Sequence, residues 1–221
     1  MSATLQIFDQ EIAVESIIPL LERYQLLPQL KREMIIDRAI APMDCTEEDI
    51  ASIRQQLPHP PEGAKEATAE AIARWVKLQK FKQAQWQHKL DHYFLQRKTQ
   101  LDQVIYSLLR TQDADLANEL YFRLLEGEQT FADLAAQYSQ GPEAAKGGLV
   151  GPVEIGAYHP SFAHVLATRA PGDLVAPLSL EDCVVIIRIE QKIPARFDEA
   201  TQQRLLDELF AAWLDAELRA S

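Results

Sequence analysis

The fold is decided by one stretch of the chain, Tyr138-Ser139-Gln140-Gly141-Pro142-Glu143-Ala144-Ala145-Lys146-Gly147-Gly148-Leu149-Val150-Gly151. It follows a segment of helical periodicity and holds four of the eight glycines in the chain. Gly141-Pro142 is a turn signal, and the glycines permit positive φ or a close approach of the backbone. A loop this irregular between two periodic segments is either a functional edge or a flexible tip. The segments on either side decide which it is.

Strand and helix patterns alternate around this loop. The pattern predicts a strand within Leu101–Arg110, a helix capped by Asp113, a helix capped by Thr130, the loop, a helix over Ser161–Arg169, and strands at Leu174–Leu178 and Cys183–Ile189. This order favours an α+β domain with a small antiparallel-dominated sheet and three to four helices.

The preceding part of the chain, residues 1–98, reads as all-helical. Pro28, Pro42 and the turn-forming Pro58–Gly63 separate the helices, and a long segment without Gly or Pro runs from Ala64 to about Thr99. A last helix over Asp198–Ala220 carries a wide apolar stripe, which needs a hydrophobic partner. We expect that helix to fold back onto the N-terminal helices and complete them as one module.

Composition narrows the class of protein. The 221 residues are 47% hydrophobic and 25% charged, as in an ordinary soluble globular protein. The first 24 residues include four acidic side chains, which argues against a signal peptide, and no apolar run reaches the roughly 20 residues of a membrane span. Two isolated cysteines make a disulfide framework improbable. These features predict a cytoplasmic protein with no membrane partner.

Charge is unevenly distributed. The net charge is −11, of which residues 101–221 contribute −10 and residues 1–100 only −1. The acidic half favours basic partners. Eight basic residues lie between Lys65 and Lys98; without a nucleic-acid-binding motif, a solvated helix face is the favoured interpretation and nucleic acid an unlikely partner. His88 and His92 share a helix face, but no cysteine or patterned carboxylate accompanies them, so we expect neither a metal nor a cofactor.

The motifs around the loop resemble those of the parvulin (rotamase) family of peptidyl-prolyl isomerases: a helix ending in Tyr138-Ser139, then Gly147-Gly148, then Pro160-Ser161-Phe162. The resemblance covers roughly residues 101–193. Met34-Ile35-Ile36-Asp37-Arg38-Ala39 is similar to a motif in the helical N-terminal module of SurA-like and PrsA-like parvulin chaperones. The resemblance implies three regions: a helical module at 1–100, a parvulin-like domain at 101–193, and a returning helix at 194–221.

The resemblance also implies a site, and here the chain departs from the family. The two histidines fall on Tyr106 and Val185, the acid after Tyr-Ser on Gly141, and the aspartate after Gly-Gly on Leu149. No family catalytic residue is retained, whereas the phenylalanine of the proline pocket is kept as Phe162. The implied peptide-binding groove is lined by Tyr106, Leu108, Leu149, Tyr158, Phe162 and Val185.

Two functions stay open from the sequence. The first is a peptidyl-prolyl isomerase or foldase-like protein that binds extended or proline-containing polypeptide clients, with isomerase activity weak or absent. The second is a non-catalytic polypeptide-binding or assembly scaffold on a parvulin fold. Loss of polar residues does not decide between them, because isomerisation needs no covalent chemistry and depends on favouring a twisted amide.

Overall fold

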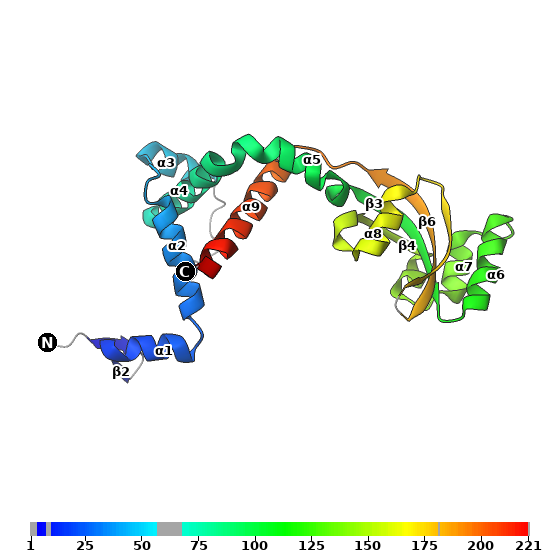
Figure 1. Cartoon of the computed structure of the whole chain (residues 1–221), viewed down its shortest axis with the longest axis horizontal. Helices are drawn as coiled ribbons and strands as arrows, with labels where there is room; N and C mark the ends of the chain where they lie inside the picture. Colours follow the sequence, from blue (N-terminus) through cyan, green and yellow to red (C-terminus); the bar gives the residue numbers. More distant parts are fainter. Residues whose placement is uncertain (1–3, 8–9, 57–67, 181, 221) are drawn as a thin grey trace. The chain divides into compact units, whose positions relative to one another are not determined.

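The computed structural model describes residues 4–7, 10–56, 68–180 and 182–220. The chain divides into two compact units, one formed by residues 1–90 with 199–221 and the other by residues 91–198 (Figure 1). The division therefore groups the C-terminal helix with the N-terminal part of the chain.

The second unit is built on a four-stranded antiparallel sheet in the order β4-β3-β6-β5. Its elements are β3 (Gln103–Thr111), α6 (Ala114–Leu125), α7 (Phe131–Tyr138), β4 (Leu149–Glu154), α8 (Pro160–Thr168), β5 (Leu174–Leu180) and β6 (Cys183–Ile193). The predicted α+β fold class is confirmed.

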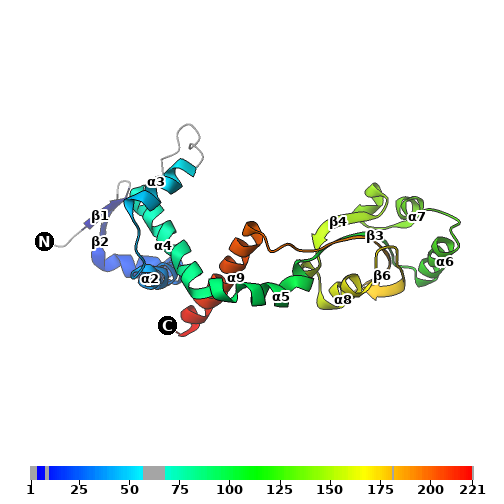
Figure 2. The ribbon, with the colours of Figure 1, turned by 90° about the horizontal axis from the view of Figure 1, so that it is seen from above.

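Helices cover both faces of this sheet, with α8 on one side and α6 and α7 on the other (Figures 1 and 2). Side chains alternate along a strand, so Tyr106 and Leu108 of β3 face α8 while Leu109 faces the other helices. Each face has its own buried apolar cluster. Full burial of one such side chain contributes about 1.5–3 kcal/mol, so the two clusters fix the register of the sheet.

Local signals in the sequence set the helix ends in this unit. The Asp113 carboxylate accepts hydrogen bonds from the backbone N–H groups of Asp115 and Leu116, and the Thr130 hydroxyl accepts one from Asp133. Both caps were expected. The glycine stretch holds a feature that was not expected, because Leu149–Glu154 forms strand β4 rather than loop. Its Gly and Pro residues disfavour a strand by composition, but β4 lies at the sheet edge, where they are tolerated.

The first unit is mainly helical. It contains β1 (Thr4–Ile7), β2 (Gln10–Ala13), α1 (Ile17–Arg23), α2 (Leu27–Ile40), α3 (Glu47–Gln56), α4 (Ala69–Trp86) and α9 (Glu199–Ala220). The expectation of an all-helical start is wrong in one detail, because β1 and β2 pair as a hairpin. The long helix expected from Ala64 is also interrupted: a 3-10 turn at Gln87–Lys89 separates α4 from α5 (Leu90–Leu101). The turn expected at Pro58–Gly63 lies outside the described residues.

The C-terminal helix completes the core of this unit, as predicted. Phe210 and Leu214 of α9 are buried with Ile36 of α2 and Phe81 of α4. The ring centroids of Phe210 and Trp86 lie 6.3 Å apart. Most of the stability of a helix in a protein comes from tertiary packing of its apolar face, so α2, α4 and α9 depend on one another.

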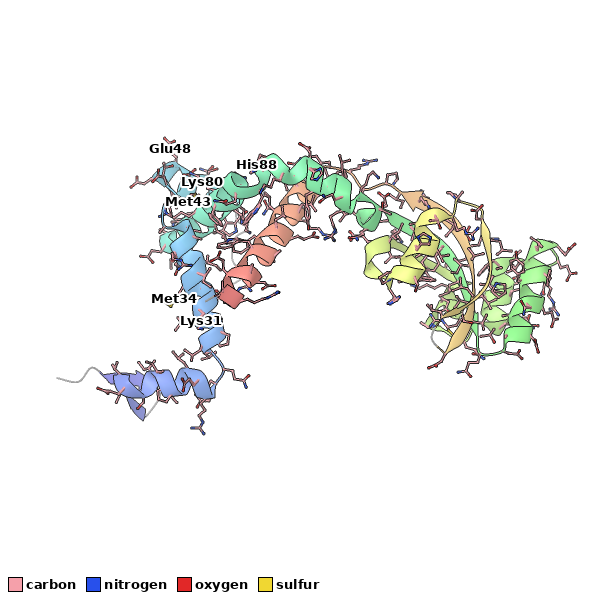
Figure 3. All side chains as sticks on the ribbon, viewed as in Figure 1. Lys31, Met34, Met43, Glu48, Lys80 and His88 are labelled. Carbon is pink, nitrogen blue, oxygen red and sulfur yellow. The ribbon has the colours of Figure 1, made fainter. Side chains whose placement is uncertain are left out.

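Acidic side chains pair with much of the basic stretch. Arg74 binds Glu33 and Asp37, Lys80 binds Asp49 (Lys80 is labelled in Figure 3), Lys82 binds Asp207, and Lys98 binds Asp102. A paired cation contributes little to the long-range positive potential that attracts nucleic acid. The pairing therefore supports a structural role for this stretch. Among the helices that the structure describes, none has the length and apolar character required to cross a membrane.

Candidate functional site

Three aromatic rings from three segments meet on the α8 face of the sheet. Tyr106 belongs to β3, Tyr158 precedes α8, and Phe162 lies in its first turn. The ring centroids are separated by 6.1 Å for Tyr106 and Tyr158, 5.8 Å for Tyr106 and Phe162, and 5.1 Å for Tyr158 and Phe162, all edge to face. Each such contact contributes about 0.5–1.5 kcal/mol beyond the burial of area. The rings therefore hold one another in a fixed arrangement.

A hydrogen bond joins the two phenols of this aromatic cluster. The Tyr106 hydroxyl donates to the Tyr158 hydroxyl over 2.8 Å. Tyr106 is only 2% exposed, whereas Tyr158 is half-buried. Burial, followed by the hydrogen bond to Tyr158, raises the pKa of Tyr106 far above the ordinary value for tyrosine. Tyr106 is therefore a neutral donor at physiological pH.

The structure brings together five of the six residues expected to line the groove. Leu108 and Val185 lie in the same buried cluster as Tyr106 and Phe162, and Tyr158 packs against it. Leu149 does not join them. It pairs with Ser107 on the neighbouring strand, so period-two alternation places it on the opposite face from Tyr106, and it is 49% exposed. Val150, which pairs with Tyr106, packs against the cluster instead.

A buried ion pair lies next to the position of the missing family acid. Glu143 accepts hydrogen bonds from Arg110 Nε at 2.8 Å and Nη2 at 2.9 Å, and from the Ser139 hydroxyl at 2.7 Å. The Ser139 hydroxyl also accepts from the Arg110 backbone N–H. Burial of the Glu143 carboxyl raises its pKa, but the hydrogen bonds from Arg110 and Ser139 outweigh this effect and leave the pKa below the ordinary value.

This ion pair explains the glycine at position 141. A Cβ atom there would lie 2.2 Å from Glu143 Oε2 and 2.4 Å from Arg110 Nε, so any other residue would force this ion pair to shift. No sequence pattern predicted Arg110 and Glu143 as partners. The available signal was Glu143, an acid two residues beyond the expected position 141. Its partner Arg110 lies on β3, which is distant in sequence.

The second close approach is at Gly148. Its φ is 82°, and an added Cβ would lie 2.8 Å from the Leu108 carbonyl oxygen. The Gly148 carbonyl accepts a hydrogen bond from the Leu108 N–H at 2.8 Å. Glycine here lets the chain lie against β3 and start the edge strand β4. The glycine stretch is thus a structural edge that bounds the aromatic cluster.

The chemistry available on this face is apolar contact and hydroxyl hydrogen bonding. The aromatic cluster carries two phenol hydroxyls, and the nearby carboxylate of Glu143 is hydrogen-bonded by Arg110 and Ser139. A carboxylate with a lowered pKa and three donors is a poor proton acceptor at neutral pH. Such a surface suits binding and twisting of an amide better than proton transfer.

Known proteins share part of this sequence. Residues 100–191 match the family model described as the PPIC-type PPIASE domain of rotamases. The chain is 34% identical over 114 residues to a Chaperone SurA of Vibrio cholerae, covering 47% of this chain and 26% of the relative. It is 30% identical over 108 residues to a Chaperone SurA of Albidiferax ferrireducens, covering 45% and 24%. The match thus spans about a quarter of the length of these curated relatives.

Two solved structures are also similar. Peptidylprolyl isomerase PrsA from Bacillus cereus shares 17% identity, with a TM-score of 0.48 over 96% of this chain and 84% of the other. The parvulin domain of PpiD from E. coli shares 23% identity, with a TM-score of 0.38 over 45% of this chain and 97% of the other.

One expectation from the sequence is wrong. The relatives are SurA chaperones, which are periplasmic in bacteria, so the predicted cytoplasmic location is not supported. That expectation rested on the acidic start of the sequence, the lack of a long apolar run and the two isolated cysteines, and these features do not determine the location. The family model and the curated relatives agree on one conclusion: residues 100–191 of this chain form a domain of the PPIC-type rotamase family.

Proposed function

We propose that this protein binds extended, proline-containing segments of polypeptide clients and isomerises their prolyl bonds slowly, as a foldase-like chaperone. The observation that carries the proposal is the aromatic cluster of Tyr106, Tyr158 and Phe162, which three separate segments bring to one sheet face. Aromatic side chains are the usual anchors at binding sites. The relatives named as chaperones support a polypeptide client rather than a small molecule.

The absence of the family's polar residues from Tyr106, Gly141, Leu149 and Val185 supports a slow reaction. Isomerisation requires that a barrier of about 18–20 kcal/mol be lowered by binding the twisted amide more tightly than the planar one. Apolar contacts with the proline ring stabilise both forms alike. A site that relies mainly on such contacts gives affinity with little acceleration.

A second candidate function is a non-catalytic polypeptide-binding scaffold. The observation that favours it is burial: Tyr106, Leu108, Phe162 and Val185 are each less than 7% exposed, so a proline ring enters only if the cluster opens.

Exchange spectroscopy by NMR on a short proline peptide tests both functions. The measurement gives the cis–trans exchange rate with and without the protein, and titration of peptide resonances gives affinity. Binding with a measurable but slow gain in exchange supports the proposed function, and binding with no gain supports the scaffold. A wild-type protein that neither binds nor isomerises any proline peptide excludes both.

A further inference from the structure

We infer that the Tyr158 hydroxyl is the catalytic hydrogen-bond donor of this domain and that Tyr106 positions it. The inference deepens the proposed function and rests on it. It assigns a polar role to Tyr106, where the family resemblance implies only the loss of a histidine, and to Tyr158, where it implies only a change in the apolar pocket.

The first support is the short contact between the two phenols. Their oxygens lie 2.8 Å apart, and because Tyr106 is buried, donation to Tyr158 is the arrangement that leaves the Tyr106 O–H with an acceptor. A phenol has one O–H, so Tyr106 has used its proton, whereas the Tyr158 proton is directed elsewhere. A hydroxyl that accepts a hydrogen bond becomes a better donor, because chains of hydrogen bonds polarise one another. Tyr106 thus strengthens the donor capacity of Tyr158.

The second support is the difference in exposure. Tyr106 is 2% exposed, while Tyr158 is half-buried and follows a 3-10 turn at the start of α8. The edge-to-face contact with Phe162 at 5.1 Å fixes the Tyr158 ring beside the family's proline-pocket residue. Tyr158 is therefore the polar group of the cluster within reach of a bound peptide.

The third support is the chemistry of the reaction. In a planar amide the nitrogen lone pair is delocalised, and twisting the C–N bond localises it on nitrogen. A donor aimed at the prolyl nitrogen therefore gains strength only as the bond twists, which lowers the barrier. A phenol hydroxyl that donates a hydrogen bond fits this role. No covalent bond forms and no proton is transferred.

Conservative substitutions test the inference. Tyr158→Phe removes only the hydroxyl, so we expect kcat for exchange to fall roughly 2- to 13-fold, the range expected for one neutral hydrogen bond, with peptide affinity unchanged. Tyr106→Phe should also lower kcat. If Tyr106 acts only through Tyr158, the double variant should match Tyr158→Phe alone. Tyr121→Phe, the same change on α6, is the matched control and should leave exchange unchanged.

Three outcomes overturn the inference. Unchanged kcat in Tyr158→Phe shows that the ring only packs or blocks the face. Losses that add in the double variant show that Tyr106 does not act through Tyr158. A wild type that binds the peptide without isomerising it removes the catalytic role and leaves the binding function standing, so failure of the inference is distinguishable from failure of the proposed function.

Discussion

Replacement of Glu143 by glutamine is the sharpest test of the buried ion pair. The carboxylate is 5% exposed and receives two hydrogen bonds from Arg110 and one from Ser139. A hydrogen bond to a charged group contributes about 1.5–3 kcal/mol, but the Arg110 side chain is 37% exposed, so solvent weakens its share. Because glutamine still accepts one of these bonds, we expect Glu143→Gln to lower the free energy of unfolding by about 1–3 kcal/mol at pH 7.

The pH dependence gives this prediction its control. The pKa of Glu143 is lowered in the folded state from its ordinary value of 4.5. Its contribution to stability is therefore complete above that value and disappears as the pH falls through the lower folded pKa. Urea unfolding followed by circular dichroism should show wild type and Glu143→Gln converging below pH 4.5. The exposed Glu126→Gln is the matched control and should follow wild type. A constant difference between wild type and Glu143→Gln down to pH 3 would refute the assignment.

Three further predictions concern packing and binding. Deletion of residues 199–221 removes Phe210 and Leu214 from the core of the first unit. Amide hydrogen exchange should therefore become faster in α2 and α4, while β3 and β6 keep their protection. Unchanged protection in α2 would contradict this prediction. Phe162→Ala should weaken binding of a proline peptide by about 1–3 kcal/mol, whereas Phe122→Ala, 58% exposed on α6, should not change the titrated affinity. Affinity for a basic proline peptide should fall between low and high salt, because residues 101–221 carry a net charge of −10; salt-independent affinity would exclude this electrostatic attraction.

Local patterns predicted most of the fold. Short stretches of sequence predict these elements, because each depends on neighbours within a few residues: the Asp113 and Thr130 caps, strands β3 and β6, and the wide apolar stripe of α9. Strand β4 was not predicted because its Gly151-Pro152 pair is a local turn signal. Its strand character comes from pairing with β3, a contact distant in sequence.

The candidate site was predicted less completely, for the same reason. Tyr106, Tyr158 and Phe162 were named from a resemblance, and the structure shows them in contact. The face on which Leu149 lies depends on its register with Ser107, which no local pattern fixes. Arg110 and Glu143 meet where Ser139, after the end of α7, hydrogen-bonds to both of them, a contact distant in sequence from β3.

Gly148, in the retained Gly-Gly motif, and Gly141, at the position of the family acid, are glycines for different structural reasons. The glycine at 148 is required by the backbone, because β3 passes too close for a Cβ atom. Glycine at 141 has a different cause: it makes room for Arg110 to bind Glu143. The acid of this region is thus present at residue 143, but it fastens the loop to β3 and cannot serve as a free base. The groups to which we assign a catalytic role on this face are the hydroxyls of Tyr106 and Tyr158. Exchange measurements on variants of Tyr106 and Tyr158 are therefore the test of whether this domain has isomerase activity.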